Sequence, residues 1–242
     1  IKMKAFNTIM IDHVSILFKA TNKCGGINII PIGTNVDVEI IIDSCIFQSN
    51  QIGAVGSAIS IQLFKGLIIQ NCTFSQCIVS SATLNGGAIY LSNNIPATNP
   101  VVPKAQIINC IFNNNKANTG HGIYFDASNT IAEIINCTLT NNHNANYVIE
   151  VNKAKETHFN NNVINFSANT YACGAIKINC MANHFVIDTK FEKTSSEGAI
   201  YYVITDTNNA NNYQFSVENC LFDQIAGSNS PAFKLWCTQP II

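Results

Sequence analysis

Two patterns of hydrophobic and polar positions alternate along this chain, and each recurs about every 27 residues. The first pattern is typified by residues 107–112, Ile-Ile-Asn-Cys-Ile-Phe, and the second by residues 86–91, Gly-Gly-Ala-Ile-Tyr-Leu. Within both patterns apolar and polar residues alternate with the period of two that is typical of a strand. Strand patterns that recur at a fixed length predict a solenoid.

A cysteine slot orders the first pattern. The slot holds Cys45, Cys72, Cys110, Cys137, Asn162, Thr189 and Cys220. Apolar residues stand three residues before the slot and two residues after it, and these offsets cannot share one face of a strand. The chain must therefore bend just before the slot, where the residues are Ser44, Asn71, Asn109, Asn136, Asn161, Asp188 and Asn219. Because Asn and Asp tolerate the left-handed conformation, this row predicts a corner between two strands.

The second pattern predicts a third strand in each repeat. Its first inward slot holds Ile27, Ile59, Ile89, Ile123, Ile149, Ile176, Ile200 and Phe233, and the residues two positions later are again apolar or aromatic. Between these two slots lies an outward row of Asn28, Ser60, Tyr90, Tyr124, Glu150, Lys177, Tyr201 and Lys234. The residue before the rung is small in all but one repeat, which indicates a tight corner.

The sequence therefore predicts an all-β fold, a single-stranded parallel β-helix of about eight coils with three short strands in each coil. Stacking at about 4.8 Å per coil would give a rod of roughly 35–40 Å. We expect one domain over residues 1–242, either a mature chain or a segment of a longer one. Leucine-rich repeats have a similar length, but their leucine framework is missing from this sequence.

Cysteine and phenylalanine are expected to form a core ladder. Cysteine recurs at one slot and phenylalanine two residues later. The ladder would consist of Cys45, Cys72, Cys110, Cys137 and Cys220 with Phe47, Phe74, Phe112, Phe191 and Phe222. Because cysteine packs as a small hydrophobe, repetition at one slot favours this ladder. Disulfides between neighbouring coils are the alternative for a chain with ten cysteines.

Two motifs resemble the repeats of the polymorphic outer membrane proteins. The family markers are G-G-A-I, present at residues 86–89, and F-x-x-N, present at 47–50 and 112–115. Weaker copies stand at 57–59, 139–142, 174–176 and 198–200. The resemblance implies a right-handed parallel β-helix of the pectin-lyase-like kind on a cell surface, commonly serving adhesion. Similar repeats are common in large surface proteins of protists.

The composition narrows the choice of partners. Charged residues make up 11% of the chain, which contains 35 Asn and no Arg, and the net charge is −1. A surface with so little positive charge argues against nucleic acid and against recruitment to an anionic membrane. No apolar run is long enough to cross a bilayer, and the first residues lack a signal-peptide pattern. We expect no direct membrane insertion of this segment.

Candidate catalytic residues are few. Residues 120–122, Gly-His-Gly, match a tripeptide of polygalacturonase-like hydrolases, but His121 lies at the ordinary corner and the chain has no Asp-Asp pair. Asp126 and Glu150 belong to adjacent coils, where a surface ion pair of Glu150 with Lys177 is the simpler interpretation. The five His show no metal-ligand spacing. We therefore expect no enzyme, no cofactor and no metal site.

Two kinds of surface contact are candidates. Tyr90, Tyr124 and Tyr201 in the outward row could form a contact face for sugar rings or proteins, or they could merely pack across the strands. Three sequons begin at Asn71, Asn136 and Asn165, and we expect at least one to carry a glycan in a secreted protein.

Apolar residues near both ends, 9–11 and 235–242, do not resemble caps. Uncapped solenoid ends predict head-to-tail self-association into a filament or continuation into a longer surface protein. We therefore expect an extracellular structural or adhesive β-helix. A carbohydrate-binding or carbohydrate-active β-helix is the alternative, and a groove of adjacent acidic residues on the outer face would favour it.

Overall fold

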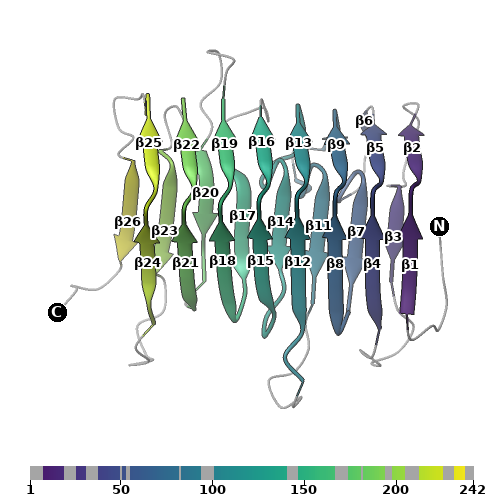
Figure 1. Ribbon diagram of the computed structural model, residues 1–242, viewed down its shortest axis with the longest axis horizontal. Coiled ribbons are helices and arrows are strands. Elements are labelled where there is room, and N and C mark those ends of the chain that lie inside the picture. Colours follow the sequence, from purple (N-terminus) through teal and green to yellow (C-terminus); the bar gives the residue numbers. More distant parts are fainter. Residues whose placement is uncertain are drawn as a thin grey trace.

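The computed structural model contains three sheets of eight strands each, shown in Figure 1. It describes residues 8–18, 26–30, 38–49, 51–52, 55–81, 83–93, 101–140, 147–166, 174–180, 182–193, 198–204, 213–225 and 232–237. Each pass of the chain adds one strand to each sheet, and the neighbouring strands run parallel. No residue within these ranges is helical. The predicted all-β parallel solenoid with three strands per coil is confirmed.

Each sheet takes one strand from each of eight coils, which are numbered here in chain order. Sheet A consists of β1 (Thr8–Asp12), β4 (Glu39–Asp43), β8 (Gly66–Gln70), β12 (Lys104–Ile108), β15 (Ile131–Ile135), β18 (Glu156–Asn160), β21 (Asn183–Ile187) and β24 (Phe215–Glu218). Sheet B consists of β2 (Ser15–Phe18), β5 (Ile46–Ser49), β9 (Thr73–Ser75), β13 (Ile111–Asn113), β16 (Thr138–Thr140), β19 (Val163–Asn165), β22 (Lys190–Glu192) and β25 (Leu221–Asp223). Sheet C consists of β3 (Ile27–Ile29), β7 (Ile59–Gln62), β11 (Ile89–Ser92), β14 (Ile123–Asp126), β17 (Tyr147–Lys153), β20 (Gly174–Ile178), β23 (Ile200–Ile204) and β26 (Phe233–Cys237).

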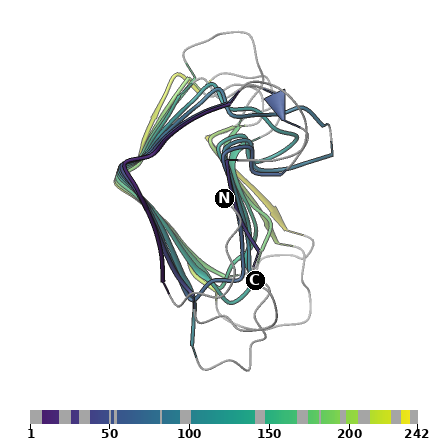
Figure 2. The same ribbon diagram turned by 90° about the vertical axis from the view of Figure 1, so that its right-hand side faces the viewer.

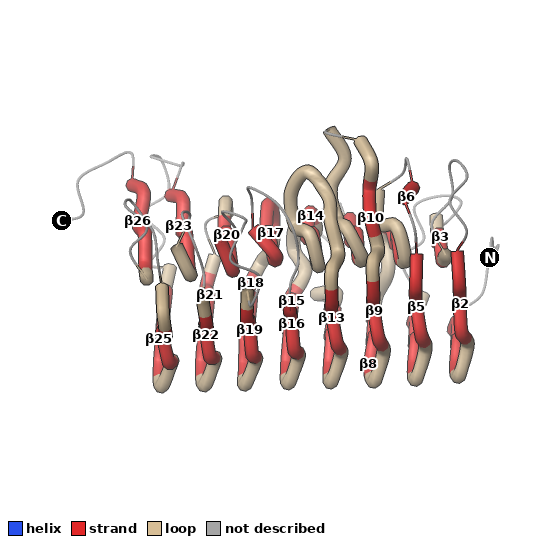
Figure 3. The backbone as a smooth tube through the Cα atoms, turned by 90° about the horizontal axis from the view of Figure 1, so that it is seen from above, coloured by secondary structure: helices blue, strands red, loops and turns tan. Residues whose placement is uncertain are grey.

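The view along the long axis shows how the three sheets enclose the core. Sheets A and B meet at a sharp corner on the left of Figure 2, and sheet C closes the coil on the opposite side. Figure 3 shows the coils side by side along the axis. A small two-stranded sheet, β6 (Gln51–Ile52) with β10 (Ile78–Val79), lies outside this frame, between the sheet B and sheet C rungs of coils 2 and 3.

The corner between sheets A and B is left-handed in every coil. The predicted row has φ values from 50° to 54°; its members are Ser44, Asn71, Asn109, Asn136, Asn161, Asp188 and Asn219. The amides also join along the axis, since Asn161 Nδ2 donates to Asn136 Oδ1 at 2.7 Å and Asn109 Nδ2 to Asn71 Oδ1 at 3.4 Å. Coil 1 has the same corner at His13, which the sequence pattern did not predict.

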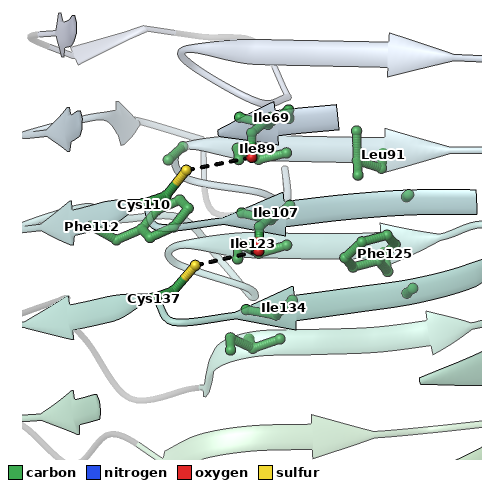
Figure 4. Close-up of a cluster of buried hydrophobic side chains, with 14 of the residues drawn as sticks. Ile69, Ile89, Leu91, Ile107, Cys110, Phe112, Ile123, Phe125, Ile134 and Cys137 are labelled. Atoms are coloured by element: carbon green, nitrogen blue, oxygen red, sulfur yellow. Dashed lines mark hydrogen bonds between the residues drawn. The ribbon is translucent and has the colours of Figure 1, made fainter. Parts of the chain in front are cut away.

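The cysteine slot carries a hydrogen-bond donor as well as an apolar side chain. Figure 4 shows Cys110 and Cys137 donating to carbonyl oxygens of the preceding coil, at 3.6 Å and 3.5 Å from sulfur to oxygen. Asn162 and Thr189 fill the same slot and donate to the equivalent carbonyls, at 2.9 Å and 3.3 Å. The slot therefore selects a small donor side chain, which explains why cysteine, asparagine and threonine exchange there.

Free thiols, not disulfides, occupy the cysteine slot. Cys45, Cys72, Cys110 and Cys137 are buried, whereas Cys220 in the last coil is only partly buried. Stacked rings continue the ladder, with centroids of Phe47 and Phe74 4.9 Å apart, of Phe74 and Phe112 4.8 Å apart, and of Phe191 and Phe222 5.0 Å apart. All of these rings are buried except Phe222, which is partly exposed. The expected core ladder thus loosens at coil 8.

The asparagine of the F-x-x-N motif caps a second turn. Asn115 is fully buried; its Oδ1 accepts the Cys77 N–H at 2.9 Å, and its Nδ2 donates to the Phe74 carbonyl at 3.2 Å. The turn includes a second left-handed row that sequence reasoning missed, Gln76, Asn114, Lys193 and Gln224. The matching motif residues Asn50 and Asn142 lie outside the described residues.

The two glycines of the G-G-A-I motif are required for different reasons. Gly86 has a φ of 71°, which favours glycine. A Cβ atom at Gly87 would lie 2.0 Å from the carbonyl oxygen of His121 in the next coil. The following slot accepts alanine, since Ala58 and Ala88 are fully buried there. The first glycine of the motif is therefore required by its backbone conformation, and the second by the close approach of two backbones.

Candidate functional sites

The outer side of sheet C carries the row of tyrosines expected from the sequence. Tyr90 pairs directly with Tyr124, and Tyr124 with Glu150, in neighbouring strands. The rings of Tyr90 and Tyr124 stack with centroids 5.6 Å apart. Further along, Lys234 Nζ lies 5.0 Å from the ring centroid of Tyr201. The register of this outward row agrees with the sequence pattern.

This row is more covered than expected, because at Tyr90 and Tyr124 the glycine four residues earlier lies against the side chain. A Cβ atom at Gly86 or Gly120 would lie 2.9 Å from the Cβ of Tyr90 or Tyr124. Tyr124 is only 8% exposed, and burial, followed by the nearby charge of Glu150, raises the pKa of its hydroxyl to about 12. The expectation of an exposed face is therefore wrong for Tyr124, whereas Tyr90 and Tyr201 are half-buried.

The ion pair of Glu150 and Lys177 exists, but it is not a surface pair. The Lys177 Nζ lies 3.4 Å from Glu150 Oε1, which also accepts the Asn179 Nδ2 at 2.8 Å. Glu150 is only 5% exposed, and the Lys177 Nζ lies 5.9 Å from the ring centroid of Tyr147. The pair therefore belongs to the packed outer layer of sheet C, which corrects the sequence interpretation.

The Gly-His-Gly tripeptide forms a corner. His121 is fully buried, and its Nδ1 accepts the backbone N–H of Ala117 at 3.0 Å. It occupies the slot that holds Ser57 in coil 2 and Gly87 in coil 3, two residues before the inward isoleucine. A histidine enclosed in this way stabilises the turn, and its geometry offers no support for a catalytic role.

The acidic residues of adjacent coils each have their own cation. Asp126 Oδ1 lies 3.2 Å from Lys153 Nζ and accepts Asn152 Nδ2 at 3.2 Å. The register shifts between Phe125 and Asp126. In the part of the chain that the structure describes, no group of three His, Cys, Asp or Glu residues is placed to hold a metal ion.

Sequence reasoning missed a second buried histidine, His184. His184 faces inward from β21 and is fully buried. Its Nε2 lies 3.0 Å from the Cys180 carbonyl, so this nitrogen carries the proton and Nδ1 accepts the Thr157 hydroxyl at 2.7 Å. Burial lowers the pKa of His184 to about 4. The ring packs edge-on against Tyr202 with centroids 5.3 Å apart, so His184 is a neutral core residue.

The three sequons lie at or near the outer side of sheet B. Asn71 and Asn136 are exposed at the left-handed corner, as expected. Asn165 is half-buried, and its Nδ2 donates to Glu192 Oε2 at 2.8 Å. Ser167, which completes the third sequon, lies outside the described residues.

Sequence reasoning missed the outer face of sheet B. In coils 2 to 6 two outward rows stack in register and contain no charged side chain. The first row is Ile46, Thr73, Ile111, Thr138 and Val163, and the second is Gln48, Ser75, Asn113, Thr140 and Asn165. These ten residues are named the neutral face. The parity of positions one and three residues after the cysteine slot could have identified them.

Comparisons of the chain with protein-family models, with curated proteins and with solved structures found no match. Within the described ranges no helix is long and apolar enough to span a bilayer.

Proposed function

We propose that the chain is a non-enzymatic, extracellular structural or adhesive β-solenoid whose open end stacks on a further coil, either of another copy or of a longer surface protein. The observation that carries this proposal is the open face of coil 8. Leu235 is 39% exposed, whereas its neighbour in the preceding coil, Tyr202, is 4% exposed. Likewise Val217 is 37% exposed and Val186 is fully buried. The inward residues of coil 8 thus have the chemistry of a core without a covering layer.

A further coil is the natural cover for this end. The strands β24, β25 and β26 each lie at the edge of a sheet, where an added parallel strand finds unpaired N–H and C=O groups. At the other end Ile9, Ile11 and Ile27 are already buried, so the two ends differ. A contact between the unlike ends of two copies is heterologous, and repeating that contact from copy to copy builds a filament.

The resemblance to polymorphic outer membrane protein repeats supports a cell-surface location. The structure gives its two motifs definite roles, at Gly86, Gly87 and Asn115. Exposure of Asn71 and Asn136 is compatible with glycosylation in a secretory pathway. An intact mass equal to the bare polypeptide, after expression in a eukaryotic secretory host, would contradict the glycan proposal.

The carbohydrate alternative has less support. The tyrosine row is partly covered, and the acids of sheet C are paired with lysines, so neither provides an open groove. A carbohydrate-active solenoid would need a pair of free carboxyl groups facing one substrate position. Asp126 and Glu150 offer no such pair.

Sedimentation velocity over a range of concentrations, with electron microscopy of the same samples, tests end-to-end association. We expect oligomers that grow with concentration and appear as rods lengthened along the axis. Leu235→Lys should abolish them by placing a charge on the open end. Leu221→Lys changes an outward residue of the same coil, 53% exposed, and should leave association intact. Monomers at all concentrations, or equal loss in both variants, would refute end-to-end association of this chain.

A further inference from the structure

The neutral face is regular in two directions. Its residues pair in register from coil to coil, so side chains in one row are spaced by about 4.8 Å, and the two rows are about 6.6 Å apart. In Figure 2 the successive rungs of sheet B coincide at the corner with sheet A and spread apart with distance from it. No described loop crosses the outer side of sheet B in that view. The face is therefore a lattice of ten side chains that is regular along the axis.

Every side chain of this lattice is uncharged. Isoleucine, valine and threonine present methyl groups, and the second row presents hydroxyl and amide groups. Ile46 and Ile111 are 47% and 48% exposed. Charge returns in coil 7, where Lys190 Nζ lies 2.6 Å from Glu192 Oε1. Sheet A differs within the same coils, since its outer side carries the pair of Lys104 and Glu133 at 2.9 Å.

The face is also rigid. Four of the five residues in its first row are isoleucine or threonine and the fifth is valine, and all five are stiff at χ1 because they branch at Cβ. In the second row the Thr140 hydroxyl donates to Asn113 Oδ1 at 3.3 Å, and Asn165 is held by Glu192. Contact with a rigid surface therefore costs little side-chain entropy.

The same chemistry argues against several partners. A polyanion needs basic side chains, and none of the ten residues is charged. Stacking on sugar rings needs aromatic side chains, which are also missing from these ten residues. Rows of methyl, hydroxyl and amide groups at fixed spacing instead match an uncharged, periodic surface. Contact with such a surface leaves no charge to be desolvated, and the hydroxyl and amide groups can hydrogen-bond to it.

We propose that the neutral face is a binding surface for ice. Ice presents a flat, uncharged lattice of water molecules whose repeat distances are comparable with those of the face. Methyl groups of the first row would lie against the lattice, and hydroxyl and amide groups of the second row would join its hydrogen bonds. This inference goes beyond the proposed function and does not depend on association through the coil ends.

Partition of the protein into slowly growing ice tests the inference directly. Protein from a host without N-glycosylation should be used, because Asn71 and Asn136 border the face. We expect enrichment in the ice fraction relative to an inert control protein, together with shaped ice crystals and thermal hysteresis. Exclusion from ice with unshaped crystals would overturn the proposal.

Matched variants within coil 4 assign the effect to the face. Ile111→Lys should abolish enrichment, whereas Ile111→Thr should retain it, because threonine fills this row in neighbouring coils. Gln106→Lys places the same charge on the outer side of sheet A and should leave enrichment unchanged. Equal loss from Ile111→Lys and Gln106→Lys would refute the assignment, provided that circular dichroism shows both variants folded. Binding of the wild type to microcrystalline cellulose, without binding to ice, would overturn it in favour of a polymer surface.

Discussion

Replacement of Phe112 by alanine probes the core at its most regular point. The ring is fully buried, it stacks on Phe74 at 4.8 Å with an interplanar angle of 11°, and its neighbour on the other side is Leu139. Removing a buried phenylalanine ring costs roughly 3–5 kcal/mol, from lost transfer energy and from the cavity that remains. For a chain of this length the melting temperature should fall by roughly 6–20 °C.

Two further variants separate burial from ring stacking. Phe112→Leu keeps most of the volume and matches Leu139 in the next coil, so we expect a loss of about 1–2 kcal/mol, of which stacking accounts for about 0.5–1.5. Ile111→Ala alters the adjacent residue, which is 48% exposed, and should cost less than about 1 kcal/mol.

Urea unfolding followed by circular dichroism gives the three free energies under one condition. The expected order of stability is Ile111→Ala, then Phe112→Leu, then Phe112→Ala. An unchanged urea midpoint for Phe112→Ala, or a larger loss for Ile111→Ala, would show that the inward and outward residues have been assigned to the wrong faces.

Three other perturbations test the corners and the core. Cys110→Ala should cost about 1–3 kcal/mol, since it leaves a cavity and removes a hydrogen-bond donor, whereas Cys110→Thr should cost less because threonine supplies a donor. Equal losses by urea unfolding would contradict the donor role. Gly87→Ala should prevent normal folding or lower the melting temperature strongly, because its Cβ would meet a carbonyl oxygen at 2.0 Å. Gly122→Ala is the control: its closest contacts lie at 3.4 Å, so it should be neutral or stabilising by up to about 1 kcal/mol. The pKa of His184 falls from 6.5 to about 4 on folding, so its contribution is complete above pH 6.5 and is lost as the pH falls toward 4. That loss is about 2 kcal/mol at pH 5. Unfolding of His184→Gln should lack this part of the pH dependence, whereas His13→Gln should retain it, and identical pH profiles would refute the assignment.

The sequence predicted the coil because its strongest signals are local. Asparagine stands before the cysteine slot in five coils and has an intrinsic tolerance for the left-handed region, so the corner could be derived from residue type there. The second left-handed row was missed because glutamine and lysine, as at Gln76 and Lys193, have no such preference. At Gln76 the surrounding turn holds this conformation, since Asn115 bonds the Cys77 N–H and the Phe74 carbonyl on either side of it.

The outer surface was harder to predict. Alternation places Tyr124 outside the sheet, but it cannot show that Gly120, four residues earlier, lies against the Cβ of this tyrosine. The donor role of the cysteine slot was hidden as well, because a thiol suits both an apolar position and a weak hydrogen bond. The exchange of Cys137 for Asn162 in the next coil was the sequence signal for that role.

The interchange at the cysteine slot has a practical consequence for biophysical work on this protein. Threonine or asparagine can stand in for each ladder thiol without removing the donor, so a variant without ladder thiols is a realistic target. Once the five cysteines outside the ladder are replaced as well, one new cysteine could be placed on any outward row and labelled with a spin probe or fluorophore. Distances between labels on chosen coils would then measure how a solenoid of stacked corners bends and twists in solution.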